Sequence, residues 1–461
     1  MKGNGDLKIA YIGGGSRAWA RTLINDLAIE KELSGKVYLY DIDFEAARDN
    51  AVIGNSLRTE KNKYADWEYV AVKTMDEVLE NADFVIISIL PGTFDEMESD
   101  VHYPEKYGII QSVGDSTGPG GILRAMRTIP IYRGFARKIK EICPDAWVVN
   151  YTNPMTMCVR SLYEEFNEIK LFGCCHEVFG TQQLLMKALK EMEGIEAESR
   201  DDIRIDVSGI NHFTWITKAT YKNYDLFDVF ERFAKKYRDI GVNAYNDERE
   251  WETNSFSCGN ILKFKLFERY GIIAAAGDRH LAEFMPKNWF LKDEKQVTDN
   301  CFRLTTVAWR RKDLAEKLEL TKQYVSGKKK LQPKKSNEEG VRQIKALLGM
   351  GDFVTNINYK NVGQMKNVPS GAVVETNCVL SGNSVSPIVA TELPPAVHSL
   401  VIRHIFNQEA LIKAVFARDK NKALSVLCND PLCAELEYEQ CRDMFDAMIK
   451  NTDRYLKEYW D

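Results

Sequence analysis

The sequence predicts an α/β protein whose first half folds around a parallel sheet. Over residues 1–197, short apolar runs alternate with helix-length amphipathic segments, and this alternation is typical of βαβ units. A glycine-rich turn follows the first apolar run, as in sheets that bind dinucleotides. Residues 198–461 are less regular and contain long helical stretches. We therefore predict an N-terminal Rossmann domain over 1–197 and a mixed α+β substrate and catalytic domain over 198–461.

Six apolar runs in the first half each predict a buried strand. They are rich in β-branched and aromatic residues, as expected of strands that helices cover on both faces. Six is also the number of strands in a complete dinucleotide-binding sheet. The predicted strands are KIAYIG (8–13), KVYLYD (36–41), EYVAV (68–72), DFVIISIL (83–90), AWVVNY (146–151) and KLFGCC (170–175).

Three later segments carry local predictions. Apolar residues at helical spacing predict a helix over 181–192, with Thr181 as its N-cap. Residues 207–221 are typical of a strand, with a polar interruption at His212. The tract 326–339 contains five lysines without periodicity and is predicted to be a solvated loop, with an anion-binding patch as the alternative.

Composition and charge exclude several classes of function. Lysine and arginine total 62 and aspartate and glutamate total 67, and this net charge of −5 argues against nucleic acid or membrane as partner. The longest clean apolar run, 84–90, is far shorter than the roughly 18 residues of a transmembrane helix. The N-terminus lacks the apolar run of a signal peptide, and ten cysteines are too sparse for a disulfide scaffold. We expect a cytoplasmic protein with a small soluble partner.

The turn after the first strand predicts a phosphate-binding loop. Gly13, Gly15 and Ala18 occupy the GxGxxA fingerprint positions, where glycines let the backbone approach a pyrophosphate. Asp41 ends the second strand, 28 residues after Gly13 where about 20 is usual, and its carboxylate can bind a ribose 2′-hydroxyl. An acid repels a 2′-phosphate, so NAD is favoured over NADP; a structural glycine turn is the alternative. The predicted cofactor-binding residues are Gly13, Gly14, Gly15, Ser16, Asp41 and Asn150.

Polar residues also follow the fourth and fifth strands, at the sheet edge where ligands bind in such folds. Segment 113–130 is glycine-rich and contains Arg124, and the fifth strand leads into Asn150 and Asn153. Turn formation is the alternative explanation for the asparagines, and an ordinary salt bridge is the alternative for Arg124.

The segment GCCHEVFG, residues 173–180, ends the sixth strand with two cysteines and a histidine. A disulfide between adjacent cysteines is strained, and no CxxC redox motif is present. Metal ligation or nucleophilic attack remains for a thiolate here, and each needs a partner. His212 is the best partner, although a histidine in an apolar run is more often a core residue.

The segment 274–286 collects Asp278, Arg279, His280 and Glu283 after three alanines. Asp278 fits the N-cap of a helix. Capping does not explain the other three residues, so we expect part of the active site here.

Together these motifs resemble glycoside hydrolase family 4, whose members depend on NAD and a metal, unlike glycosidases with two catalytic carboxylates. The similarity covers nearly the whole chain, and the motifs follow the family's order. The resemblance implies a fold related to lactate and malate dehydrogenases. The motifs are GGGS (13–16), the strand that ends in Asp41, GPGGILRAMRTIP (118–130), NPM (153–155), Cys175 with His176, and NHF (211–213).

The resemblance implies a catalytic divalent cation, usually manganese, bound by Cys175 and His212; such ligands would equally accept iron, cobalt or zinc. Several phosphoglycoside-cleaving relatives have an aspartate after the metal cysteine, whereas this chain has His176. In this respect it resembles the members that cleave α-linked uronic acids, α-galacturonidases in particular, and we assign His176 as the proton donor. The predicted base is Asp278 or His280, because the tyrosine that some relatives use is absent from this part of the sequence.

The implied reaction is a hydrolysis without net redox change. NAD oxidises C3 of the sugar, a base removes the acidified C2 proton, the leaving group departs from C1 by elimination, water adds, and the hydride returns, while the cation stabilises charge on O2 and O3. For the carboxylate of a uronate, Arg279 is the first candidate ligand and Arg124 the second. Asn153 and Asn211 are the other predicted substrate contacts. Relatives imply a homodimer or homotetramer.

Three other functions compete with this prediction. An α-glucosidase or α-galactosidase of the same family differs only in the sugar. An NAD-dependent hydroxy-acid dehydrogenase shares the fold but would form NADH stoichiometrically. A non-catalytic NAD-binding sensor, with Cys175 as a regulatory thiol, would leave the NHF and GDRH motifs without a role.

Overall fold

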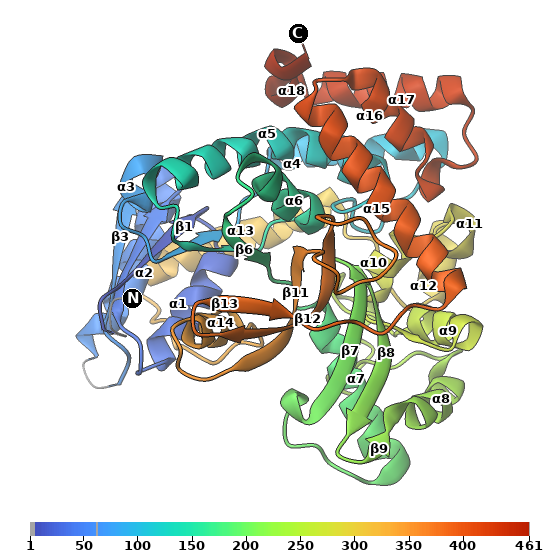
Figure 1. Cartoon of the computed structure of the whole chain (residues 1–461), viewed down its shortest axis with the longest axis horizontal. Helices are drawn as coiled ribbons and strands as arrows, with labels where there is room; N and C mark the ends of the chain where they lie inside the picture. The colour runs from blue at the N-terminus through green and yellow to red at the C-terminus, as the bar shows by residue number, and fades with distance from the viewer. Residues whose placement is uncertain (1–4, 61–62, 461) are drawn as a thin grey trace.

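The computed structural model describes residues 5–60 and 63–460 (Figure 1). Within them, two sheets organise the chain, one of nine strands and a smaller one built on β7, β8 and β10. In Figure 1 the first strands of the larger sheet lie at the left, near the N-terminus. The hairpin of β7 and β8 extends to the lower right, and the C-terminal helices lie at the upper right. No helix in these residues is long and apolar enough to cross a membrane.

The larger sheet contains the six predicted parallel strands. Their order is β3-β2-β1-β4-β5-β6, with strands added outward on both sides of the β1–β4 boundary. This order is that of a dinucleotide-binding fold, so the predicted fold class is confirmed. The strands are β1 (Leu7–Ile12), β2 (Gly35–Tyr40), β3 (Trp67–Val72), β4 (Phe84–Ile87), β5 (Trp147–Asn150) and β6 (Lys170–Gly173).

Helices cover both faces of this sheet. One face packs against α1, α2 and α14, and the other against α3, α5 and α6. Because both faces are buried, β4 and β5 are apolar along nearly their whole length. The covering helices are α1 (Trp19–Ile29), α2 (Phe44–Ser56), α3 (Met75–Leu79), α5 (Gly118–Ile142), α6 (Met155–Glu165) and α14 (Gly340–Leu347).

Three strands from the second half of the chain extend this sheet, which the sequence did not predict. β11 (Phe353–Lys360) pairs with β6, and β12 (Val373–Ser381) and β13 (Ser384–Pro387) follow, all antiparallel. The sheet therefore crosses the predicted division at residue 197, and that division stays a prediction.

The single strand predicted over 207–221 is wrong. The chain forms two antiparallel strands, β7 (Ile203–Ile210) and β8 (Phe213–Tyr221), and the polar interruption is the turn between them. His212 lies in this turn with a φ of 64°, which is uncommon for a residue other than glycine. β9 (Tyr224–Asp225) and β10 (Ile273–Ala274) both pair with β8, along the edge opposite β7.

The helix after β6 begins earlier than predicted. α7 spans Glu177–Glu193, so the assignment of Thr181 as N-cap is wrong. Thr181 lies inside the helix, where its hydroxyl donates to the carbonyl oxygen of Ala275 at 2.6 Å and accepts from the Lys263 ammonium at 2.7 Å. The hydroxyl therefore ties α7 to the second half of the chain.

The lysine-rich tract 326–339 is a loop between α13 (Val307–Val325) and α14, as predicted. Lys328, Lys329 and Lys330 are exposed, whereas the last glutamates of the tract are partly or fully buried. This end of the loop packs against the N-terminal half of the chain.

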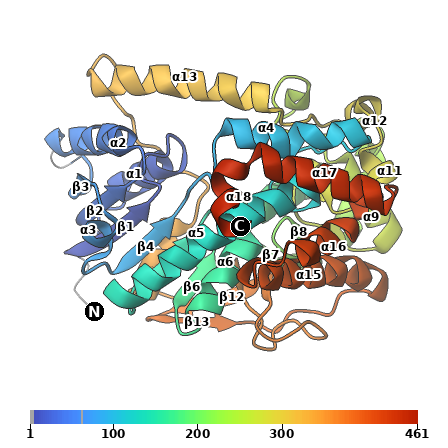
Figure 2. The same cartoon turned by 90° about the horizontal axis from the view of Figure 1, so that it is seen from above.

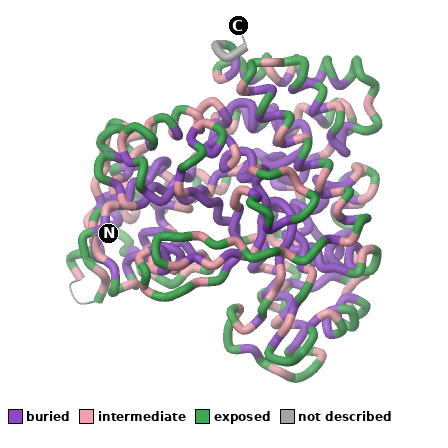
Figure 3. The backbone as a smooth tube through the Cα atoms, in the orientation of Figure 1, coloured by how far each residue is buried: buried purple, intermediate pink, exposed green. Residues whose placement is uncertain are grey.

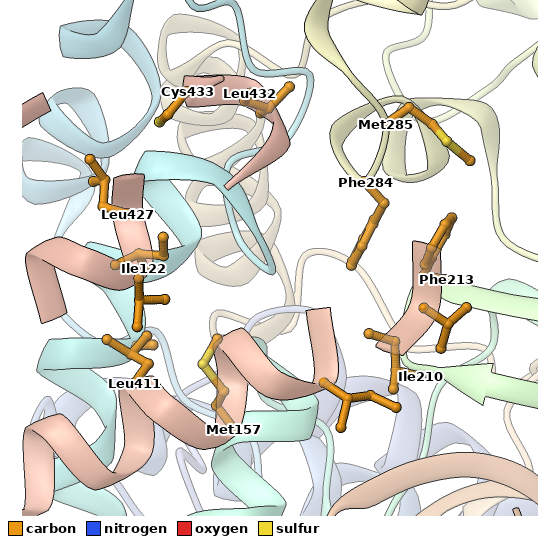
Figure 4. Packing of buried hydrophobic residues seen from close by; sticks show 14 of the residues in the cluster. Ile122, Met157, Ile210, Phe213, Phe284, Met285, Leu411, Leu427, Leu432 and Cys433 are labelled. Carbon is orange, nitrogen blue, oxygen red and sulfur yellow. The ribbon is translucent and has the colours of Figure 1, made fainter. Parts of the chain in front are cut away.

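The C-terminal helices pack on α5 and α6 through the largest apolar cluster of the described residues (Figures 2 and 4). Ile122, Met157, Leu411 and Leu427 meet on one side of it, and Phe213 stacks on Phe284 at 4.8 Å on the other (Figure 4). The cluster joins the β7–β8 hairpin to the helices above the first sheet. The remaining helices are α4 (Phe94–His102), α8 (Leu226–Tyr237), α9 (Ile261–Tyr270), α10 (Asp278–Glu283), α11 (Lys287–Phe290), α12 (Glu294–Asp299), α15 (Pro395–Phe416), α16 (Lys420–Cys428), α17 (Tyr438–Asn451) and α18 (Asp453–Trp460).

Candidate active site

Three separate elements bring one carboxylate and two imidazoles together. Asp115 lies in the loop before α5, His212 in the β7–β8 turn and His280 on α10. One potential ligand atom from each lies within 4.8 Å of the others, and all three residues are buried. The three residues are thus part of the buried interior. Buried residues dominate the centre of the molecule, whereas many loops at its edge are exposed (Figure 3).

Hydrogen bonds fix the orientation of these groups. The Ser116 hydroxyl lies 2.8 Å from Asp115 Oδ1 and 2.9 Å from His212 Nδ1. The ring centroids of His212 and His280 lie 3.7 Å apart with the rings tilted by 32°, and His280 Nε2 lies 3.4 Å from Glu177 Oε1. Among residues 5–60 and 63–460, none is a hydrogen-bond partner of the buried His280 Nδ1. A buried polar atom of this kind is expected where a ligand completes the site.

The charges of this group suit a divalent cation. Burial raises the pKa of Asp115, but the neighbouring His212, His280 and Arg124 outweigh it and hold the pKa well below the usual range. Burial and the neighbouring His280 lower the pKa of His212 to about 3. An ionised carboxylate beside neutral imidazole is a donor set that binds manganese, iron, cobalt or zinc. The residues present therefore fit a metal site.

Cys175 lies outside this three-residue group but next to it. Its thiol is buried beside the side chain of Asn211, and Asn211 is the residue before His212. Burial and the charges of Glu375 and Glu177 raise the pKa of the thiol well above its ordinary value, which argues against a free thiolate nucleophile. The role of Cys175 as a metal ligand stays a prediction.

His176 lies at the N-terminus of α7, with its side chain partly open to solvent. Its Nδ1 is 3.1 Å from Glu338 Oε1, and its ring lies 5.6 Å from that of Trp19, which begins α1. Burial lowers the pKa of His176, but the hydrogen bond to Glu338 and its charge outweigh burial and raise it. The raised pKa favours the protonated imidazole, and the role of His176 as proton donor stays a prediction.

Asp278 holds two helices together. Its carboxylate accepts hydrogen bonds from the N–H groups of Leu262 at 3.1 Å and Lys263 at 3.3 Å, at the start of α9. Burial raises its pKa to about 6. The prediction that Asp278 is an N-cap is therefore wrong: α10 begins at Asp278 with Gly277 as its N-cap, and the Asp278 carboxylate binds the start of α9 instead. Its role as a base stays a prediction.

The predicted substrate residues surround the three-residue group. Asn153 Nδ2 lies 3.4 Å from Asp115 Oδ2, and Arg124 Nε donates to the carbonyl oxygen of Asn153 at 3.0 Å. The side-chain amide of Asn211 is buried beside Cys175 and Glu375, and within the described part of the chain neither of its polar atoms has a partner at hydrogen-bond geometry. Arg279 donates to Thr305 Oγ1 at 3.1 Å. The side-chain amides of Asn153 and Asn211 therefore indicate a ligand site, in addition to the sequence positions from which they were predicted.

The glycine loop packs closely against the strand ends beside it, and its contact with a nucleotide stays a prediction. Gly13 has a φ of 92°, and a Cβ there would lie 2.0 Å from the carbonyl oxygen of Ser88. Asp41 Oδ2 accepts the N–H of Gly15 at 2.9 Å, and Ser16 Oγ accepts the N–H of Trp19 at 3.0 Å. The loop is therefore held tightly against β2 and β4.

Asn150 serves the turn after β5. Its Oδ1 accepts from the hydroxyl of Tyr132 at 2.6 Å and from the N–H of Thr152, and its Nδ2 donates to the carbonyl oxygen of Thr152. These bonds support the structural alternative, and contact with a cofactor stays a prediction.

Four contributors were given no role from the sequence. Asp115 and Ser116 lie in the glycine-rich segment after β4, and Glu177 follows the predicted acid His176 directly. The signal that could have found them is position, since polar residues after successive parallel strands meet at one sheet edge. Glu338 had no such signal, because it lies in a loop far along the chain.

The comparison with known families decides the identity. Residues 8–191 match the profile described as family 4 glycosyl hydrolase, and residues 207–433 match its C-terminal domain. The chain belongs to family 4 of the glycosyl hydrolases. The resemblance of the sequence motifs to this family is thereby confirmed, and the protein is a glycoside hydrolase.

Relatives in this family cover the whole chain. An α-galacturonidase from Thermoanaerobacterium saccharolyticum is 56% identical over 98% of this chain and 97% of its own length. An α-galacturonidase from Bacillus subtilis is 48% identical over 96% and 97%. An α-galactosidase from the same organism is 30% identical over 98% and 99%.

Solved structures agree with the fold. The Bacillus subtilis protein LplD superposes with a TM-score of 0.91 at 47% identity, covering 96% of this chain and 99% of its own. A 6-phospho-α-glucosidase from gut microorganisms, solved in complex with NAD and Mn²⁺, has a TM-score of 0.78 at 19% identity, covering 97% and 98%. The second likeness concerns the fold alone.

Replacing His212 with alanine should abolish tight binding of Mn²⁺. We expect the affinity to fall more than about 100-fold, since even contacts outside the ligand sphere affect metal affinity 10- to 100-fold. Electron paramagnetic resonance of free Mn²⁺ during titration measures the change. His398→Ala, on α15 and outside the site, is the matched control. An unchanged affinity in the His212 variant would exclude this metal site.

Proposed function

We propose that this protein is an α-galacturonidase that uses NAD and a divalent cation, with manganese as the expected metal. The observation that carries the proposal is the buried group of Asp115, His212 and His280, placed at the same sheet edge as the glycine loop. Full-length relatives named α-galacturonidase, at 47–56% identity, support the galacturonide as substrate. Solved members of the fold with NAD and Mn²⁺ support the cofactors.

The chain supplies a binding surface for both groups. The tight turn at Gly13 to Ser16 would hold the NAD pyrophosphate, and Asp41 would bind the adenosine ribose. Asp115 and His212 would hold the cation, with Cys175 as the further ligand that the family implies. When bound, NAD accepts hydride from C3 of the sugar and the cation stabilises negative charge on O2 and O3.

His280 is better placed than Asp278 to remove the C2 proton. The carboxylate of Asp278 is engaged with the N–H groups of α9, whereas His280 Nδ1 has no partner. The opposite nitrogen of His280 faces Glu177, whose pKa is held well below its usual range by His280 and Arg279 despite burial. An ionised carboxylate behind an imidazole orients and strengthens a general base.

His176 would protonate the leaving oxygen, and Arg279 would bind the substrate carboxylate, with Arg124 as the second candidate. Arg124 already donates to the backbone at Asn153, which favours Arg279. Asn153 and Asn211 border the cation group and would donate to sugar hydroxyls. A homodimer or homotetramer in the cytoplasm remains our expectation for the assembly and its location.

The substrate class is tested with 4-nitrophenyl α-galacturonide, α-galactoside, α-glucoside and a 6-phosphoglycoside in the presence of NAD, Mn²⁺ and a thiol reductant. We expect the galacturonide to be cleaved with kcat/KM at least about tenfold above the α-galactoside and the α-glucoside, because neither neutral sugar has an anionic group to pair with the site arginines. NAD should act catalytically, without net NADH, and a chelator should stop cleavage. Preference for a neutral sugar would favour the α-galactosidase alternative, and NADH formed in step with substrate would favour a dehydrogenase.

His176→Gln should slow the cleavage of galacturonides with sugar leaving groups about 100-fold or more, because a positioned general acid contributes that much. Nitrophenolate leaves without protonation, so kcat for the 4-nitrophenyl substrate should change less than about tenfold. Steady-state rates with both substrates give the comparison. Equal losses on the two substrates would mean that His176 does not protonate the leaving group.

The two candidate bases can be separated by isotope exchange. In D₂O the wild type should incorporate deuterium at C2 of the product, which NMR detects. His280→Gln should lose this exchange while retaining NAD binding, and Asp278→Asn should retain exchange in whatever fraction of the protein folds. Exchange that persists without His280 would place the base elsewhere.

A further inference from the structure

We propose that Arg310, on the first turns of α13, is a second guanidinium ligand for the anionic group at C6 of the substrate, beside Arg279. This inference rests on the proposed function, because it assigns a residue to the recognition of the galacturonide carboxylate. The inference rests on two observations. The start of α13 is bonded to the loop that contains Asp115, and the Arg310 side chain has no hydrogen bond or ion pair with the residues that the structure describes.

Arg310 differs from the other arginines near the site. Arg127 forms a buried pair with Asp100, and Arg124 donates to the backbone at Asn153. Among the residues that the structure describes, the Arg310 side chain forms no hydrogen bond or ion pair, and its Nε is buried and unpartnered. A cation withdrawn from water without an anion is unfavourable. An arriving carboxylate would relieve this cost.

The start of α13 is fixed to the catalytic loop. The N–H of Thr305 donates to the carbonyl oxygen of Ser112 at 2.8 Å, three residues before Asp115. Thr305 Oγ1 accepts from Arg279, which itself lies 4.7 Å over the Phe256 ring. Trp309, the neighbour of Arg310, packs on the same ring at 4.7 Å. Arg279 and the neighbour of Arg310 therefore contact the same aromatic ring.

The remainder of α13 runs away from this point. It lies along α4 and α2 over the outside of the molecule, as Figure 2 shows. Only Val307 and Thr321 of its residues are buried. The position of Arg310 is thus set by the first turn, and not by a large apolar face of the helix.

The charges around Arg310 agree with an anion site. Burial, Arg124 and Arg279 together lower the pKa of Arg310 to about 10, although Asp115 and Glu283 act to raise it. Glu283 is already bound to the N–H groups of Val113 and Gly114. Asp115 faces the two histidines. Neither carboxylate neutralises Arg310 directly.

A guanidinium binds a carboxylate or a phosphate equally well by paired N–H donors. The shared chemistry is an anion at C6 of the sugar, either the carboxylate of a uronide or the phosphate of a 6-phosphoglycoside. The relatives at 47–56% identity are named α-galacturonidase, which favours the uronide. The experiment includes a uronide and a 6-phosphoglycoside.

The test compares Arg310→Met and Arg310→Lys with Arg311→Met. Arg311 is the matched control because it follows on the same helix, is about half exposed, and pairs with Asp95 at 2.6 Å. For Arg310→Met we expect KM for 4-nitrophenyl α-galacturonide to rise about 10- to 100-fold, the usual effect of losing one charged hydrogen bond. KM for the α-galactoside should not change, and the lysine variant should fall between the two.

Melting temperature and NAD binding show whether each variant is folded. An unchanged KM for the galacturonide in a folded Arg310→Met variant overturns the assignment of Arg310 and leaves the proposed function intact. Equal effects on galacturonide and galactoside indicate a structural role and also overturn it. Selective loss on the 6-phosphoglycoside would assign Arg310 to a phosphate. Failure of the wild type to cleave the galacturonide overturns the proposed function and this inference together.

Discussion

The candidate active site depends on holding Asp115, His212 and His280 within a few ångströms of one another away from water. Buried ionisable groups cost several kcal/mol each unless neighbours compensate them, so every surrounding contact has a role. Ser116 bridges Asp115 and His212, and Glu177 faces His280. The backbone on both sides of Asp115 is also held. Glu283 accepts the N–H groups of Val113 and Gly114, and Asp430 accepts the hydroxyl of Thr117 and the N–H of Gly118. The arrangement is thus a network and not three independent side chains.

The fold makes this network possible by bringing distant segments to one edge of the sheet. The glycine loop, the loop before α5, and the ends of β5 and β6 all follow parallel strands, so they meet at the carboxyl edge. The β7–β8 turn and α10 arrive from the second sheet. Phe213 follows His212, and Phe284 follows the last residue of α10. The stacking of these two rings fixes the distance between the β7–β8 turn and α10. Apolar packing directly beside the polar group therefore sets its geometry.

The sequence predicts the parts of this structure that depend on local patterns. Six parallel strands and the glycine loop followed from apolar runs and spacing, and the family from motifs in order. Long-range partners could not be predicted: β11 to β13 complete the first sheet from beyond residue 350, and Glu338 reaches His176 from a lysine-rich loop. His212 was located, but the hairpin was missed because the turn interrupts an otherwise continuous apolar pattern. Thr181 was misassigned because its side chain bonds across the structure to Ala275 and not to its own helix.

The central claim is that a divalent cation binds between Asp115 and His212, beside a nucleotide on the glycine loop. Anomalous diffraction from crystals grown with Mn²⁺ and NAD, recorded at the manganese edge, tests it most directly. The account predicts one strong peak within coordination distance of Asp115 and the His212 imidazole. A peak at a different place, or no peak in crystals that contain bound NAD, would contradict it.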